Sequence, residues 1–163
     1  MDDYIPMTRS GYNKLKAEMQ HMESVLMPAI AEKIASARAE GDLSENAEYH
    51  AQREAQGLLQ AKINLVKSKL SRANIIDLSK LPRDQVSFGA TVVVKDPDLG
   101  DEEVFTLVGA GEENYNEGRI LTDSPLGQAL IGRKPGDMVD VPAPKGTYQL
   151  EIVSIRFEFV EGE

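Results

Sequence analysis

Two carboxylates, Asp42 and Glu45, stand close together in a short segment between two long helical patterns. Carboxylate oxygens suit Mg²⁺, but this ion keeps several waters and usually needs phosphate oxygens or further acids as ligands. Two acids at a free turn therefore bind Mg²⁺ weakly. They could still supply ligands for a second ion beside one already fixed in a partner, and two ions about 4 Å apart stabilise the attacking and leaving oxygens in phosphodiester cleavage.

The same two acids also fit a structural role. Asp42 and Glu45 have the spacing of a capping box, with Asp42 as N-cap and Glu45 at the third helical position. Acids also favour a helix N-terminus through the backbone dipole. The two roles are compatible, because a cap fixes the rotamers that a metal site would use. His50 could join either acid at a metal, or it could be a polar surface residue.

Apolar residues recur at helical spacing on both sides of these acids. The first helix is expected from the caps Thr8 or Ser10 to Gly41, with a seam at Tyr12, Leu15, Met19, Met22, Leu26, Ile30, Ile34 and Ala37. The second is expected from near Ser44 to about Ala73, with a seam at Ala51, Ala55, Leu59, Ile63, Val66, Leu70 and Ala73. A stutter that contains Pro28 should bend the first helix.

Two such helices joined by a short turn form an antiparallel hairpin of about 45 Å that carries Asp42 and Glu45 at its far end. On the second helix, Lys62, Lys69 and Arg72 share one face. This face is either a solvated surface or a contact with an RNA strand. No aromatic residue is interleaved with these cations, so base stacking is not expected.

The second half is rich in short β patterns. Strands are expected at Gln85–Phe88 with Thr91–Val94, Glu103–Val108, Arg119–Thr122, Met138–Val141 and Thr147–Phe159. A short helix is expected from Pro125 to Leu130 with Ser124 as its cap. The simplest arrangement is α+β, an antiparallel sheet covered by one helix.

Composition excludes several classes of protein. The chain has 163 residues, no cysteine and two histidines, so disulfides, thiolate metal sites and common catalytic triads are not expected. No apolar run approaches the roughly 20 residues of a membrane helix. The net charge of -9 lies mainly in residues 79–163, which do not suit a phosphate backbone. A cytoplasmic monomer is expected.

The segment from Ala37 to His50 resembles the tip of the bacterial Gre family of transcript-cleavage factors. Further resemblances to this family, in the family's order, are Ile5–Thr8 with Gly11, Phe88–Val92, and Ser124-Pro125 with Leu130–Gly132. The resemblance implies a coiled-coil hairpin in residues 1–78, with an acidic tip at 41–48. It also implies an FKBP-like α+β domain in residues 79–163.

The resemblance further implies a function. Gre factors bind bacterial RNA polymerase, dock at the rim of its secondary channel and insert the coiled coil. Their tip acids, here Asp42 and Glu45, help to hold a second Mg²⁺ in the polymerase, where backtracked RNA is cut near its 3′ end. Such a factor is no enzyme alone and binds no cofactor tightly. Supporting tip positions are Arg38, Ser44, Asn46, Glu48 and Tyr49, and docking positions are Asp123, Ser124 and Pro125.

Three alternatives stay open at this point. A catalytically silent secondary-channel regulator would share the hairpin and the docking domain, although the matching Asp42 and Glu45 argue against it. A prolyl isomerase would need a pocket lined by aromatic residues, which are few in the second half. A coiled-coil arm that binds RNA directly would show steeply salt-dependent binding.

Overall fold

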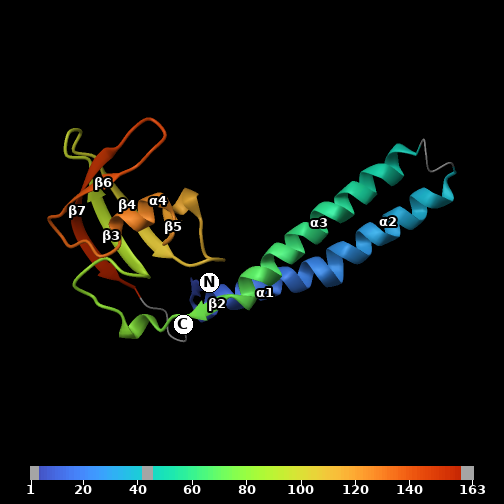
Figure 1. Cartoon of the computed structure of the whole chain (residues 1–163), viewed down its shortest axis with the longest axis horizontal. Helices are drawn as coiled ribbons and strands as arrows, with labels where there is room; N and C mark the ends of the chain where they lie inside the picture. Colours follow the sequence, from blue (N-terminus) through green and yellow to red (C-terminus); the bar gives the residue numbers. More distant parts are fainter. Residues whose placement is uncertain (1–3, 42–45, 159–163) are drawn as a thin grey trace. The chain divides into compact units, whose positions relative to one another are not determined.

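The structure, a computed structural model, describes residues 4–41 and 46–158. The chain forms two compact units, which are Met1–Tyr4 with Asn13–Ala73, and Ile5–Tyr12 with Asn74–Glu163. We call them the hairpin unit and the sheet unit. The sheet unit also takes in the first turn of the first helix. The predicted α+β class is confirmed (Figure 1).

The first arm of the hairpin is helical in three pieces, α1 (Arg9–His21), the π-helical turn η1 (Met22–Leu26) and α2 (Met27–Ala39). The Met27 amide donates to the Met22 carbonyl, which closes the π turn. Pro28 follows directly at the start of α2. Proline has no amide hydrogen and crowds the preceding turn, so a wider turn before it removes both conflicts. The predicted disturbance at Pro28 therefore takes the form of a π turn.

The buried seam of this arm follows the predicted spacing on both sides of the π turn. The buried apolar side chains are Leu15, Met22, Ile34 and Ala37. Leu26 is exposed, contrary to the prediction, and Met27 is half-buried in its place. A π turn contains about one residue more than an α turn, so it moves the seam from residue 26 to residue 27.

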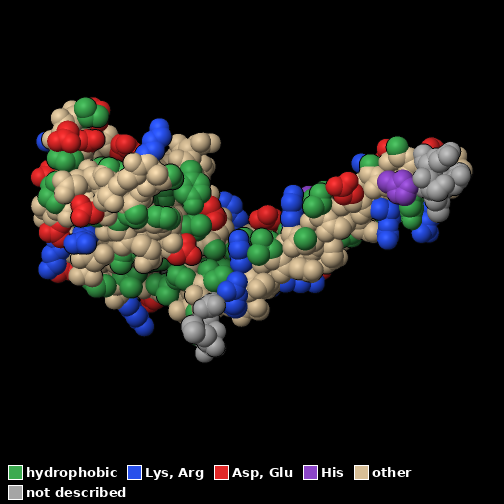
Figure 2. Space-filling model, turned by 45° about the horizontal axis from the view of Figure 1, so that its top comes forward, with side chains coloured by type: hydrophobic (Ala, Val, Ile, Leu, Met, Phe, Trp, Pro, Cys, Tyr) green, Lys and Arg blue, Asp and Glu red, His purple; other side chains and the backbone are tan. Residues whose placement is uncertain are grey.

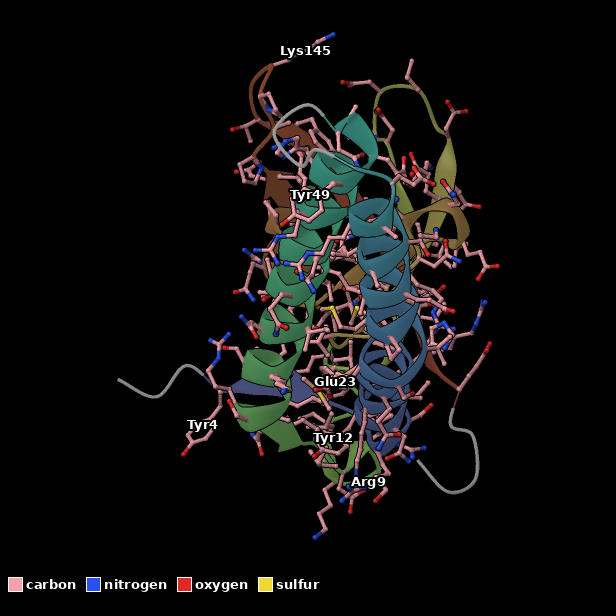
Figure 3. The ribbon with its side chains drawn as sticks, turned by 90° about the vertical axis from the view of Figure 1, so that its right-hand side faces the viewer. Tyr4, Arg9, Tyr12, Glu23, Tyr49 and Lys145 are labelled. Atoms are coloured by element: carbon pink, nitrogen blue, oxygen red, sulfur yellow. The ribbon has the colours of Figure 1, made fainter. Side chains whose placement is uncertain are left out.

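The second arm is α3 (Ala47–Ser71), which lies antiparallel beside α2 (Figure 1). Its buried side chains are Leu59, Ile63 and Val66, as predicted. Lys67 Nζ lies 3.1 Å from Glu23 Oε2, and Figure 3 shows Glu23 between the two arms. Both members of this ion pair are about half exposed, so it contributes little. The apolar seam holds the arms together, at roughly 1.5–3 kcal/mol for each fully buried side chain.

Gly57 gives a stability prediction for the hairpin. It lies on an exposed part of α3, with open space where a Cβ would stand. We expect Gly57→Ala to stabilise the hairpin unit by about 0.8 kcal/mol, because alanine loses less backbone entropy in a helix than glycine does. Thermal unfolding followed by far-ultraviolet circular dichroism measures the change. A lower unfolding temperature than wild type would contradict the expectation.

Two short strands, β1 (Ile5–Met7) and β2 (Ala73–Ile75), pair as a separate two-stranded sheet. The Ile76 amide extends this pairing by donating to the Met7 carbonyl at 2.8 Å, and the Met7 side chain is fully buried. These two strands were not predicted from the sequence. Three residues are too few to establish the alternation that marks a strand.

The segment that follows β2 contains one 3₁₀ turn, η2 (Leu78–Lys80), with Asp77 as its N-cap. Asp77 Oδ1 accepts from the Ser79 hydroxyl at 2.6 Å and from the Ser79 amide at 3.0 Å. Both hydrogen bonds lower the pKa of the Asp77 carboxyl below its ordinary value. The bond from the Ser79 hydroxyl makes the larger contribution to this lowered pKa, and the bond from the Ser79 amide makes the smaller one. The stabilisation that this cap contributes is therefore fully present at a pH above the ordinary pKa of an aspartate. It is lost as the pH falls through the lowered pKa of Asp77.

The main sheet of the sheet unit has the strand order β5–β4–β3–β7–β6. Its strands are β3 (Ala90–Lys95), β4 (Glu102–Val108), β5 (Arg119–Leu121), β6 (Met138–Val141) and β7 (Tyr148–Phe157). Neighbours run antiparallel as predicted, except that β4 and β5 are parallel. The connection 109–118, which includes η3 (Tyr115–Glu117), reverses the chain twice and allows this pairing.

The expected strand at Gln85–Phe88 is absent from the described sheet. Val86 instead exchanges hydrogen bonds with the loop after the short helix, because its amide donates to the Arg133 carbonyl and its carbonyl accepts from the Gly132 amide, both at 2.8 Å. The Val86 side chain is fully buried. Its apolar character thus reflects the core and not a strand.

The predicted short helix is α4 (Pro125–Leu130), which packs against β5 and β6. It covers the face of the sheet on which the core lies. This core includes Val92, Val94, Leu107, Leu130 and Ile152. In the described part of the chain, no helix is both long and apolar enough to span a membrane.

Candidate functional site

The turn between the hairpin arms is the site that the sequence singled out. α2 ends with Glu40 as its C-cap. Gly41 follows with φ of 131°, a conformation that favours glycine. On the other side, α3 begins at Ala47. Three predicted tip residues lie outside the described residues: the acids Asp42 and Glu45, and the supporting residue Ser44.

Asn46 caps the second arm. Its Oδ1 accepts from the Tyr49 amide at 3.0 Å, while its Nδ2 donates to the Ala37 carbonyl of α2 at 2.6 Å. The prediction that Asp42 is the N-cap of this helix is wrong, because α3 starts after Asn46. Asparagine is about as good an N-cap as aspartate. The geometry therefore leaves the capping role to Asn46.

Arg38 and Tyr49 lie across from each other on the two arms. The Arg38 guanidinium carbon is 5.8 Å from the centre of the Tyr49 ring, which is within the range of a cation–π contact. His50 stands edge to face with Tyr49, with ring centres 5.5 Å apart. Figure 3 shows Tyr49 on α3 near the turn. These contacts bring Arg38 and Tyr49, which were predicted to support the tip, together with His50, which was considered as a metal ligand.

The described acids beside the turn, Glu40 and Glu48, are exposed. Glu48 Oε1 accepts from Gln52 Nε2 at 3.0 Å, and both acids border a shallow groove with Lys33 and Ser36. In residues 4–41 and 46–158, no group of three or more His, Asp or Glu side chains could hold a metal ion.

The basic face of α3 is less uniform than its spacing indicates. Lys62 is exposed, but Lys69 and Arg72 are half-buried. Arg72 is also the C-cap of α3, and its Nε donates to the Ser68 carbonyl at 3.4 Å. Figure 2 shows the Lys and Arg side chains scattered along the hairpin among other residues. Of the three predicted RNA contacts, Lys62 is the most accessible.

The predicted docking residues lie at the start of α4. The Ser124 hydroxyl accepts from the Gly127 amide at 3.1 Å and donates to the Leu121 carbonyl at 2.6 Å. Ser124 is therefore occupied as the helix cap. Asp123 and Pro125 on either side of it are exposed and can contact a partner.

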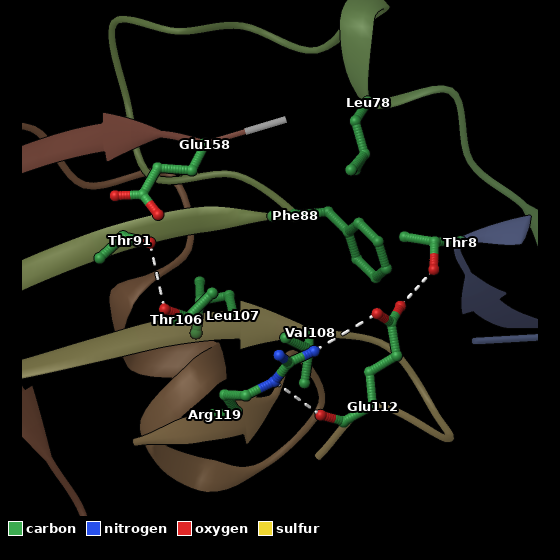
Figure 4. A pocket seen from close by; sticks show the side chains of 11 residues that line it. Thr8, Leu78, Phe88, Thr91, Thr106, Leu107, Val108, Glu112, Arg119 and Glu158 are labelled. Atoms are coloured by element: carbon green, nitrogen blue, oxygen red, sulfur yellow. Dashed lines mark hydrogen bonds and ion pairs between the residues drawn. The ribbon is translucent and has the colours of Figure 1, made fainter. Parts of the chain in front are cut away.

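The sheet unit contains a polar network that was not predicted from the sequence. The Thr8 hydroxyl donates to Glu112 Oε1, Arg119 Nη2 lies 3.3 Å from Glu112 Oε2, and Arg119 Nε donates to the Glu112 carbonyl at 2.9 Å. These residues border a pocket of about 230 Å³ (Figure 4). Phe88 is the aromatic residue in its described lining. Thr8 and Glu112 are too far apart in sequence for any periodic signal to join them.

This network gives a second stability prediction. The Glu112 side chain is only 11% exposed, and its removal leaves the buried Thr8 hydroxyl without its acceptor. Arg119 loses its ion pair but keeps the bond from its Nε to the backbone carbonyl of residue 112. We expect Glu112→Ala to destabilise the sheet unit by about 2 kcal/mol. Urea unfolding of the full chain measures the effect.

The matched control for Glu112→Ala is Arg156→Ala. Arg156 pairs with Glu158 at 2.8 Å, but both side chains are more than half exposed. Exposed ion pairs contribute little, so this change should stay within about 0.5 kcal/mol of wild type. Equal effects of the two substitutions would contradict a structural role for Glu112.

Comparison with known proteins gives two family matches. Residues 5–75 match the N-terminal model of the transcription elongation factors GreA and GreB, and residues 81–157 match the C-terminal model of the same factors. The matched ranges follow each other and together cover most of the chain.

Relatives match over nearly the whole length. The chain is 49% identical to the transcription elongation factor GreA of Thermodesulfovibrio yellowstonii, over 97% of this chain and 100% of that protein. It is also 49% identical to GreA of Brucella anthropi, over 93% of this chain and 97% of that protein. Among solved structures, GreA factor homolog 1 of Thermus thermophilus matches with a TM-score of 0.45 and 22% identity, over 94% of this chain and 99% of that one.

Proposed function

This chain belongs to the GreA/GreB family of transcription elongation factors, and on that premise we propose that it binds bacterial RNA polymerase and stimulates the polymerase's own cleavage of backtracked RNA. The hairpin unit would enter the secondary channel, and arrested complexes would resume elongation from the new 3′ end. The chain would not be an enzyme alone, because the polymerase supplies the reaction centre. It would act in the cytoplasm.

One observation supports this proposal above the others, which is the position of the acids along the hairpin. α2 ends at Ala39 and α3 begins at Ala47, so Asp42 and Glu45 belong to the short connection where both arms stop. α3 alone has 25 residues and is about 38 Å long. An arm of this length can carry acids into a narrow channel of another protein.

The acids have a defined role in this proposal. Asp42 and Glu45 would give carboxylate oxygens to a second Mg²⁺ whose other ligands belong to the polymerase and the RNA. When bound, such an ion stabilises charge on the oxygens around the cleaved phosphate. Two carboxylates are too few to hold Mg²⁺ tightly, which makes the chain dependent on its partner. Arg38, Ser44, Asn46, Glu48 and Tyr49 would support the tip.

The rest of the chain would anchor the factor. Exposed Asp123 and Pro125, with Ser124 as the cap between them, would contact the rim of the channel. Lys62 would be the main contact with RNA on α3, and Lys69 and Arg72 would contribute less, because they are half-buried.

The test uses purified bacterial RNA polymerase halted in a backtracked complex with labelled RNA. Added chain should shorten the RNA from its 3′ end much faster than polymerase alone does, as followed on a sequencing gel. A chain that binds the polymerase without faster cleavage would instead be the silent regulator.

A further inference from the structure

Asn46 is the one described side chain that hydrogen-bonds to both sides of the turn. Its Nδ2 donates to the Ala37 carbonyl at 2.6 Å, and its Oδ1 accepts from the Tyr49 amide at 3.0 Å. The partners fix the orientation of the amide, because a carbonyl can only accept and a backbone amide can only donate. Both ends of the side chain are therefore in use.

These two bonds go to different helix ends. The Ala37 carbonyl of α2 already accepts from the Glu40 amide at 3.2 Å, so the Asn46 side chain adds a second bond to this oxygen. The first amides of α3 have no partner inside their own helix, and Asn46 supplies one for Tyr49. Ala37 is 2% exposed, so its carbonyl belongs to a closely packed part of the arms. Asn46 itself is half-buried. The Arg38–Tyr49 contact crosses between the same helix ends.

We propose that Asn46 is a positioning residue, which straps the end of α2 to the start of α3 and so fixes the two ends of the connection that carries Asp42 and Glu45. This inference rests on the proposed function. The strap, and not the cap, is the part that matters for cleavage. A cap stabilises α3 alone, but the bond to Ala37 sets the separation between the arms at the turn.

Two substitutions of Asn46 separate the effect of its bond to Ala37 from the effect of its bond to Tyr49. Serine keeps a hydroxyl oxygen that can cap α3, but it is too short to reach the Ala37 carbonyl. Alanine loses both bonds. Asn46→Ser therefore removes the strap and keeps the cap, and Asn46→Ala removes both. Gln60→Ala is the matched control, since it removes only the exposed bond between Gln60 and Asn64 on α3, away from the turn.

The first measurement needs no polymerase. Nuclear magnetic resonance of the full chain should show scalar coupling across the hydrogen bond between the Asn46 side-chain nitrogen and the Ala37 carbonyl carbon. The Tyr49 amide should exchange slowly with solvent in wild type and in Asn46→Ser, and faster in Asn46→Ala. Absence of the coupling in wild type would overturn the inference.

The second measurement is RNA cleavage by halted polymerase at saturating chain. We expect Asn46→Ser and Asn46→Ala to lower the rate about tenfold, since small misplacements of reacting groups cost at least this much. The Mg²⁺ concentration for half the maximal rate should rise in both variants. The chain concentration for half the maximal rate should not change. Gln60→Ala should match wild type in all three quantities.

The outcomes separate the inference from the function on which it rests. If Asn46→Ser cleaves at the wild-type rate and with the wild-type Mg²⁺ requirement, the strap has no positioning role and the inference is overturned. If the wild-type chain itself fails to stimulate cleavage, the proposed function falls, and the positioning role falls with it.

Discussion

Asp42→Asn should lower the rate of stimulated RNA cleavage about 100-fold at saturating chain, with binding to the polymerase unchanged. Asparagine has nearly the same size as aspartate, but it has lost the negative charge that makes the carboxylate a ligand for Mg²⁺. Removal of one group that stabilises charge in a transition state commonly costs this much or more. The measurement is the decay of full-length RNA in a single-turnover reaction.

The control for this prediction is Glu54→Gln, which makes the same isosteric loss of charge at an exposed position of α3. It should leave both the cleavage rate and polymerase binding at wild-type values. Glu45→Gln should behave like Asp42→Asn, because the two acids act on one ion. Wild-type cleavage by Asp42→Asn would refute a role for the tip acids and would favour the silent regulator.

The hairpin could be predicted because burial along a helix has a period. Leu59, Ile63 and Val66 repeat at steps of four and three, so their burial was expected from spacing alone. The same reasoning gave the exact bounds of α4, because Ser124 and Pro125 form a local start signal. Each of these signals is contained within a few residues.

The prediction was wrong where the backbone changed its own period. Leu26 is exposed because the π turn before Pro28 adds a residue, and spacing rules assume that the helix stays regular. The cap of α3 was misplaced for a different reason. Asp42 and Asn46 are both good cap residues by type, so residue type alone does not choose between them, and in the structure Asn46 is the N-cap of α3.

The remaining features depend on contacts between distant segments. Thr8 and Glu112 meet only once the sheet unit has folded, and the parallel pairing of β4 with β5 depends on the path of 109–118. Neither leaves a pattern in the local sequence. The tip acids were found by the chemistry of their side chains, and their role in cleavage stays a prediction.

Gly127→Ala should destabilise the sheet unit by about 3 kcal/mol, because the added methyl group has no room. A Cβ at this position would stand 2.4 Å from the Leu121 carbonyl oxygen and 2.7 Å from that of Thr122. Both obstacles are backbone atoms and cannot turn aside as a side chain would. Relief of the clash would pull α4 away from β5 and weaken the Ser124 cap. Amide hydrogen exchange of Val92 and Val94, in the core of the sheet, measures the loss.

Gly132→Ala is the control that separates the clash from backbone strain. Gly132 has φ of 82°, which alanine adopts at a cost of about 1 kcal/mol, but nothing lies within 4 Å of its Cβ position. Gly127 has the opposite combination, an ordinary φ and no space. Gly127→Ala should therefore be clearly the less stable variant. If the two variants were equally stable, α4 would have to shift freely on the sheet, and Asp123 and Pro125 could not form the fixed docking surface that the proposed function needs.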